Sequence, residues 1–157
     1  MTREAQNPDD ELSQQALEIS ADQDFWGPEL TGQDCVMRDA GDVEPRAFDL
    51  AERTAKFGEA IIRFAKRIPQ NPINNRLIDQ LVGAGTSVGA NYCEADDGVS
   101  RKDFKNKIGI CRKEARETKF FLRMIATSEE GLKPEARILW QEAKELHLIF
   151  CAVWRRN

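Results

Sequence analysis

Apolar side chains recur at alternating spacings of four and three residues in four successive segments of the chain. This spacing places the apolar groups on one face of an α-helix, and no segment shows the strict alternation typical of a half-buried strand. The pattern predicts an all-α fold whose helices share one core. In the third segment the alternation is unbroken over seven positions: Phe104, Ile108, Cys111, Ala115, Thr118, Leu122 and Ile125.

Proline and capping residues indicate where these helices end. Pro69 stops the first helix, Ser100 and Asp103 form a capping pair at the start of the third, and Pro134 suits the first turn of the fourth. Short connections between helices of similar length predict an antiparallel up-down four-helix bundle over residues 46–157. We expect its helices over about 48–68, 73–97, 101–127 and 133–155.

The two signs of charge are unevenly distributed along a chain whose formal net charge is −4. Residues 1–45 hold twelve acidic and two basic side chains with few clustered apolar ones. Such a composition cannot offset the entropy cost of ordering, so we expect a mostly disordered acidic arm. Within the arm, Phe25 and Trp26 either dock into an apolar groove or belong to a loose linker. Residues 46–157 hold twenty-one basic and fifteen acidic side chains, so the predicted bundle is basic.

Six basic side chains fall on one flank of the third predicted helix, beside its apolar positions, over about 33 Å. They define the basic stripe: Arg101, Lys105, Arg112, Arg116, Lys119 and Arg123. Such a stripe can neutralise phosphates and bind RNA or DNA without reading its sequence. Alternatively, its charges pair with Glu94, Asp96 and Asp97 in the same chain, or with the acidic flank of a neighbouring subunit.

The second predicted helix is rich in small residues, although each glycine in a helix costs up to about 1 kcal/mol relative to alanine. Gly85 and Gly89 lie four residues apart on one face, and we interpret them as positions where another helix approaches closely. A ligand-binding surface is the alternative, but a phosphate-binding loop is excluded because the glycines lie mid-helix without a GK[ST] motif. Asn91 and Glu94 flank the same helix's core positions, where they can bond side chains of the third helix.

One flank of the fourth predicted helix carries Trp140, His147, Cys151 and Trp154. Together with the core positions of this helix and with Leu148 and Ile149, this is more apolar surface than a single bundle buries, so we predict a homo-oligomer interface there. The alternative is a broad core covered by the N-terminal arm. His147 is the only histidine and lacks the Glu-x-x-His spacing of a di-iron site, so we predict no metal site and no cofactor.

The four cysteines lie far apart and form no CxxC pair: Cys35, Cys93, Cys111 and Cys151. We expect small buried hydrophobic residues rather than disulfides or a zinc site. The sequence contains no recognisable catalytic motif, so we predict no catalytic residues and a protein that is not an enzyme. It also lacks an uncharged apolar run of about 18 residues and a secretory signal, which predicts a cytoplasmic protein without membrane contact.

Many residues of the second and third predicted helices occur at fixed spacings: Gly85-Thr86-Ser87-Val88-Gly89-Ala90-Asn91, Glu94-Ala95, Ser100, Asp103-Phe104, Lys107, Ile110, Glu114-Ala115 and Glu117-Thr118, with Phe48-Asp49-Leu50 at the start of the bundle. This pattern resembles the four-helix-bundle proteins encoded in intervening sequences of 23S ribosomal RNA. The resemblance covers about residues 46–157. Phe120-Phe121 replaces the family's usual aromatic pair, and the acidic arm is not part of the pattern.

The resemblance implies a homo-oligomer, most often a pentameric ring, and a nucleic-acid-binding role without catalytic residues. We therefore expect a homo-oligomer of bundles that binds RNA or DNA through the basic stripe. The alternative is a structural or protein-interaction module whose stripe is used in salt bridges within or between subunits. The acidic arm would limit access to the stripe as a polyanion mimic, or bind a protein partner.

Overall fold

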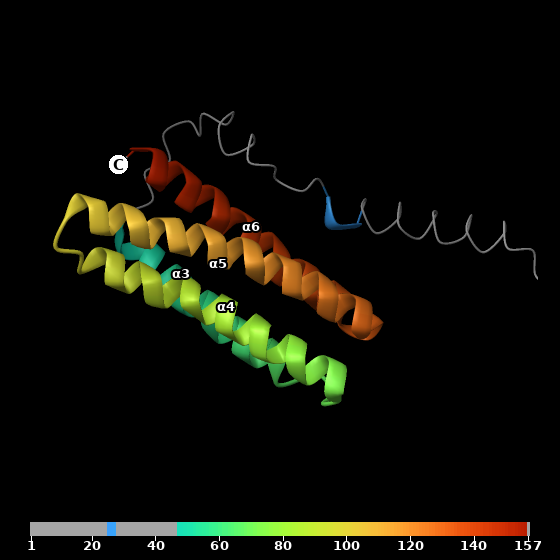
Figure 1. Cartoon of the computed structure of the whole chain (residues 1–157). Helices are drawn as coiled ribbons and strands as arrows, with labels where there is room; N and C mark the ends of the chain where they lie inside the picture. Colours follow the sequence, from blue (N-terminus) through green and yellow to red (C-terminus); the bar gives the residue numbers. More distant parts are fainter. Residues whose placement is uncertain (1–24, 28–46, 157) are drawn as a thin grey trace, which may run out of the picture. The chain divides into compact units, whose positions relative to one another are not determined.

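Four long helices make up most of the protein that the structure describes (Figure 1). The computed structural model describes residues 25–27 and 47–156. Each long helix packs against the next and is joined to it by a short connection, so the predicted antiparallel up-down bundle is confirmed. The helices are α3 (Ala47–Ala65), α4 (Pro72–Asp96), α5 (Arg101–Ser128) and α6 (Lys133–Arg156), with the 3-10 helix η1 (Glu130–Leu132) before α6.

Side-chain caps define the starts of α4 and α5. The side-chain oxygen of Asn71 accepts hydrogen bonds from the backbone N–H groups of Ile73 at 3.0 Å and Asn74 at 2.8 Å. At the next turn, the hydroxyl of Ser100 accepts one from the N–H of Asp103 at 3.1 Å, so the predicted cap is present. Each cap satisfies N–H groups that have no partner inside the helix, which stabilises the helix start by about 1 kcal/mol.

The first long helix ends at Ala65, earlier than the expected Ile68. The backbone N–H groups of Arg67 and Ile68 bond to the carbonyl oxygens of Phe64 and Ala65, at 3.0 and 3.2 Å. These bonds reach back three residues, so the chain tightens after α3 instead of continuing as an α-helix. The cause is Pro69, because a proline disfavours helical backbone at the residue before it.

The apolar positions predicted from the spacing form the core. Burying a Leu, Ile or Phe side chain contributes about 1.5–3 kcal/mol, so these residues supply most of the folding energy. A few predicted core positions near helix ends, Leu77, Phe104 and Val153, are only half-buried. The largest fully buried apolar side chains are Trp140, Phe64, Phe150, Ile61, Leu81, Ile108, Leu122, Ile125, Leu146 and Val88.

Two glycines of α4 lie against α3. A Cβ atom at Gly85 would lie 2.9 Å from two side-chain carbons of Ile61, and one at Gly89 would lie 3.3 Å from the carbonyl oxygen of Thr54. Both distances are shorter than ordinary van der Waals contact, so no other residue type fits here without movement of α3. The absence of side chains at these positions therefore allows the close approach of the two helices.

Ion pairs join α3 and the turn after it to α6, the last helix of the bundle. Arg53 donates from Nε and Nη2 to the two carboxylate oxygens of Glu142, at 2.6 and 2.8 Å, and from Nη2 to Glu145 at 2.6 Å. Towards the other end, Arg67 pairs with Glu135 at 2.5 Å. The forked contact of Arg53 helps to fix the position of α3 relative to α6, which pack against each other less extensively than the other neighbouring helices do.

A polar cluster around Asn74 of α4 connects the turn before this helix to the end of α5. Asn74 is fully buried, and its Nδ2 donates to the carbonyl oxygen of Pro69 at 2.8 Å and to Glu129 Oε1 at 2.6 Å. Its Oδ1 accepts a hydrogen bond from the hydroxyl of Ser128 at 2.6 Å. The amide therefore has partners on both atoms, as a buried polar group requires.

The cysteine predictions hold only in part. Cys111 is buried and Cys93 is exposed, and both are free thiols, so the expected burial is wrong for Cys93. Cys151 is buried and disulfide-bonded, so the expectation of an unpaired thiol is wrong for this residue. Cys35 lies outside the described residues.

Most of the acidic arm also lies outside the described residues, and with it the prediction of disorder over 1–45. Phe25 and Trp26 are described, and their rings contact edge to face with centroids 5.2 Å apart. Their docking and the cytoplasmic location stay predictions. Within the described part of the chain, no helix has the length and apolar character needed to span a membrane.

Candidate nucleic-acid interface

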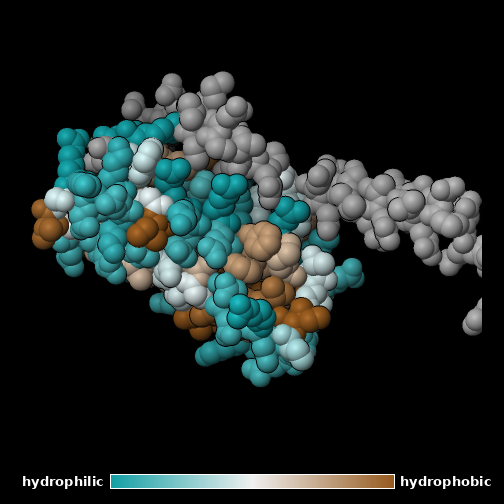
Figure 2. Space-filling view, viewed as in Figure 1, coloured by the Kyte–Doolittle hydropathy of each residue, from teal (hydrophilic) through white to brown (hydrophobic). Residues whose placement is uncertain are grey.

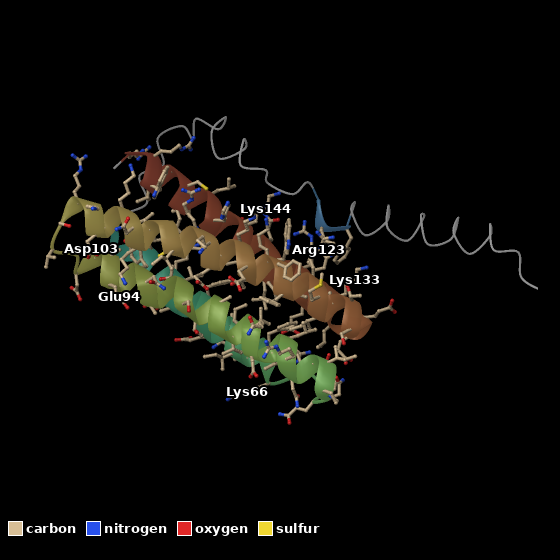
Figure 3. All side chains as sticks on the ribbon, in the orientation of Figure 1. Lys66, Glu94, Asp103, Arg123, Lys133 and Lys144 are labelled. Atoms are coloured by element: carbon tan, nitrogen blue, oxygen red, sulfur yellow. The ribbon has the colours of Figure 1, made fainter. Side chains whose placement is uncertain are left out.

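The basic stripe lies on the flank of α5 that faces α6. Because the stripe borders the core positions of α5, several of its side chains lie against the neighbouring helix. Arg101 and Arg116 are exposed, Lys105, Arg112 and Arg123 are half-buried, and Lys119 is buried. In Figure 3, Arg123 lies with Lys133 and Lys144 of α6 along one side of the bundle, whereas Glu94 and Asp103 lie near the turn between α4 and α5.

The ring of Trp154 on α6 contacts two cations of the stripe. The Lys105 Nζ atom is 4.6 Å and the Arg112 Cζ atom 4.7 Å from the centroid of its ring, within the range of cation–π attraction. Gly109 lies between these cations on α5, and a Cβ there would be 3.6 Å from Trp154 Nε1. The indole thus occupies a gap in the α5 surface, and 36% of Trp154 is exposed. We call Lys105, Arg112 and Trp154 the Trp154 site.

A second tryptophan, Trp140, is surrounded by three cations. Lys119 of α5 lies 4.8 Å from its ring centroid, and Arg137 and Lys144 of α6 lie at 4.9 and 5.4 Å. The two α6 cations were not among the predicted site residues, although they lie three residues before and four after Trp140 and so share its helix face. The basic stripe together with Arg137 and Lys144 forms what we call the cationic face.

The guanidinium of Arg112 is partly desolvated, and no carboxylate of the described residues pairs with it. Its Nε atom is buried and has no hydrogen-bond partner among the described residues. Burial lowers the pKa of Arg112, and the positive charge of Arg155 lowers it further. Buried polar groups normally have a partner, so Arg112 offers an unused N–H donor and a positive charge to an anion.

The predicted partners within the chain do not neutralise the stripe. Glu94 of α4 pairs with Lys107, which lies off the stripe. Asn91 donates to the carbonyl oxygen of Ser87 in its own helix, at 2.9 Å. In the described part of the chain, no carboxylate forms an ion pair with four stripe residues: Arg101, Lys105, Arg112 and Arg116.

The four α6 residues predicted to form an oligomer interface differ in exposure. Trp140, His147 and Cys151 are buried, so Trp154 alone of the four offers much surface to a second copy. Exposed apolar side chains also occur elsewhere, for example Ile138 of α6 at 71%. Figure 2 shows hydrophobic groups among hydrophilic ones over α4 and α5. The position of an interface stays a prediction.

An open groove of about 420 Å³ lies between α3 and α6. Arg53 and Glu142 line it and bond each other, while Phe57 and Leu139 supply apolar surface. The groove therefore presents a neutralised ion pair rather than an acid and a base poised for catalysis. Among the described residues, no group of three or more His, Cys, Asp or Glu side chains is arranged to hold a metal ion.

Comparison with known proteins agrees with this architecture. A crystal structure of a protein of unknown function from the S23 ribosomal protein family of Bacteroides thetaiotaomicron matches with a TM-score of 0.61 and 25% sequence identity, covering 69% of this chain and 97% of that one. No curated protein matches the chain. The family described as 23S rRNA-intervening sequence protein matches residues 46–150, which span α3 to α5 and most of α6. The chain therefore belongs to the 23S rRNA-intervening sequence protein family.

Proposed function

We propose that the protein is a non-enzymatic nucleic-acid-binding protein that binds RNA or DNA through the cationic face of α5 and α6. One observation carries the proposal. Arg101, Lys105, Arg112 and Arg116 project from one flank of α5, and no carboxylate of the described residues pairs with them. Positive charges that the described residues leave without a carboxylate partner favour an external polyanion.

The dimensions of the stripe suit a phosphate backbone. From Arg101 to Arg123 it extends about 33 Å along a straight helix, so it can follow several phosphates at once. Each neutralised phosphate releases bound counterions, which makes affinity high at low salt and independent of base sequence. The competing hypothesis is a protein-interaction module, in which the acidic flank of another subunit covers the same charges.

Salt-dependent binding of the full chain to labelled RNA and DNA tests the proposal. A double variant, Arg101→Glu with Arg116→Glu, reverses two exposed charges on the stripe. Lys66→Glu with Arg76→Glu is the matched control, because it makes the same change in net charge at exposed positions outside the stripe. Lys66 lies in the turn after α3, and Arg76 lies on α4. The stripe variant should bind nucleic acid more weakly than the wild type. The slope of its log binding constant against log salt concentration should be smaller by about 0.7–0.9 for each phosphate contact that is lost.

Two results would contradict the proposal. Wild-type protein that binds neither nucleic acid at low salt excludes it directly. Equal loss of affinity in the stripe variant and the control variant means that only net charge matters, so no particular face binds. Retained affinity in the control with loss in the stripe variant supports binding by the cationic face.

We also propose that the bundle assembles into a homo-oligomer, as the family resemblance implies. The exposed apolar side chains of Ile73 and Phe120 support this, because side chains of this kind are common in subunit contacts. Light scattering at micromolar concentration measures the assembly mass directly. A monomer at all concentrations contradicts the proposal, whereas a discrete mass at a multiple of the 17.8 kDa chain supports it.

A further inference from the structure

The Trp154 site combines an accessible aromatic ring with two cations that the described residues leave without carboxylate partners. We propose that this site binds single-stranded nucleic acid, with one unpaired base stacked on the indole of Trp154 and neighbouring phosphates bound by Lys105 and Arg112. The inference rests on the proposed function and adds the strand state of the ligand and the residue that selects it.

The arrangement on α5 places a phosphate-binding group on each side of the ring along the helix. Lys105 and Arg112 are seven residues apart, or about 10 Å along α5. Gly109 lies between them, and its lack of a side chain leaves room for the indole. A nucleotide that meets the exposed part of Trp154 therefore has a cation within reach on either side.

Lys105 and Arg112 form stronger contacts with a phosphate than with the ring of Trp154. A cation–π contact at an exposed site contributes a factor of about two to five in an equilibrium constant. A base stacked on an aromatic side chain contributes a factor of about five to 150. The unpartnered Nε of Arg112 would also obtain a charge-assisted hydrogen bond to a phosphate oxygen. The ring therefore gains more from a stacked base than it loses with the cations, and the cations gain phosphate contacts.

A stacking residue discriminates between strand states because paired bases are already stacked on their neighbours. Duplexes offer the protein mainly their phosphates, whereas single strands offer base faces as well. The rest of the stripe has no aromatic side chain, so it binds either form mainly through charge. The preference for single strands should therefore depend on Trp154 and hardly at all on Arg101 or Arg116.

Binding of a single-stranded oligonucleotide of about 20 nucleotides, and of the duplex of the same sequence, tests this with the full chain at low salt. Trp154→Leu removes the ring, Trp154→Phe keeps an aromatic ring, and Ile138→Ala is a control for loss of an exposed apolar group on the same helix. We expect Trp154→Leu to weaken single-strand binding about tenfold with less than about a twofold change for the duplex. Trp154→Phe should retain most of the affinity, and Ile138→Ala all of it.

Intrinsic fluorescence gives an independent measure that does not depend on affinity. Stacking on Trp154 should quench part of the emission of the wild-type protein when the single strand is added, and that part should be missing in Trp154→Phe. Circular dichroism of each variant verifies that the bundle is folded.

The inference fails if Trp154→Leu weakens both strand states equally or neither of them, or if single strands quench the wild type and Trp154→Phe alike. In those cases the proposed function still stands, provided that binding remains sensitive to salt and to charge reversal at Arg101 and Arg116. If the wild-type protein binds neither strand state at low salt, the proposed function and this inference fail together.

Discussion

His147 of α6 donates a hydrogen bond from Nδ1 to the backbone carbonyl oxygen of Arg112 on α5, at 3.0 Å. Because a carbonyl oxygen can only accept, the neutral imidazole must carry its proton on Nδ1. The only histidine of the chain thus fixes the backbone from which a stripe cation projects. A residue predicted for an oligomer interface and one predicted for nucleic-acid binding are parts of a single interhelical contact.

This contact predicts a loss of stability in mild acid. Burial is the main cause that lowers the pKa of His147 below its usual 6.5; the hydrogen bond to Arg112 opposes this, and the charges of Lys119, Arg112 and Arg116 add to the lowering. The unfolded chain therefore binds a proton at a higher pH than the folded chain does. The free energy of unfolding should decrease as pH falls below about 6.5 and level off below the folded-state pKa. Urea denaturation between about pH 7.5 and pH 5.5 measures this decrease.

His147→Gln is the control for the pH effect, because glutamine retains an N–H donor and does not titrate in this range. The variant should lose the decrease near pH 6.5 while keeping the acid unfolding that carboxylates cause at lower pH. Since the chain has one histidine, its imidazole proton resonance reports the folded-state pKa without ambiguity. A pKa at or above 6.5 in that titration would contradict the burial argument.

The helical architecture could be predicted because it follows from local spacing. A 4-3 alternation fixes one apolar face, and four such faces of similar length have few ways to share a core. The contacts between distant helices could not be predicted in this way. Arg53 bonds Glu142, 89 residues away, and that choice depends on how α3 and α6 dock. A sequence shows several acids and bases at suitable faces but not which of them meet.

The candidate site also has a part that local spacing predicts and a part that depends on how the helices pack. Periodicity places Lys105, Arg112 and Arg116 on one flank of α5, and this is a local property of the helix. The position of Trp154 beside Gly109, and the cations around Trp140, depend on the rotation of α6 about its axis. That rotation results from packing of the whole core, so it is invisible in either segment alone.

Asn74 should be more important for stability than any other polar side chain near the start of α4. Asn74→Ala removes the partners of the Pro69 carbonyl, the Glu129 carboxylate and the Ser128 hydroxyl at once. Each of these three hydrogen bonds contributes about 0.5–1.5 kcal/mol net, so we expect a combined loss of about 1.5–4.5 kcal/mol by urea denaturation. Asn75→Ala is the matched control on an exposed neighbour and should change stability by less than about 0.5 kcal/mol. Equal effects of the two variants would show that the cluster contributes little.

The two free thiols of the described residues should react at very different rates. Cys93 is exposed, whereas Cys111 is buried, its Sγ lies 3.5 Å from the Val88 carbonyl oxygen, and burial raises its pKa to about 12. Only the thiolate is a nucleophile, so at pH 8 an alkylating reagent should label Cys93 within minutes and leave Cys111 unmodified. Peptide mass spectrometry after native and after denaturing alkylation distinguishes the sites. Rapid native labelling of Cys111 would mean that the core of α4 and α5 opens readily.

The approach of α3 to α4 predicts opposite effects for alanine at two glycines of one helix. At Gly85 a Cβ would lie 2.9 Å from side-chain carbons of Ile61, so Gly85→Ala forces the helices apart and should cost about 1–3 kcal/mol. At Gly83 no atom lies within 4 Å of the added Cβ, so Gly83→Ala should instead stabilise the helix by about 0.5–1 kcal/mol. Thermal unfolding of the two variants compares the same chemical change in the same helix.

A double variant identifies the cause of the loss at Gly85. Ile61→Ala removes the carbons that an alanine at position 85 would meet, while costing stability through its own cavity. If steric overlap is responsible, Gly85→Ala should be nearly harmless in the Ile61→Ala background, so the two changes should be strongly non-additive. Simple additivity of the two losses, or a stabilising effect of Gly85→Ala alone, would show that α3 moves away without cost and that the glycine is not required for packing.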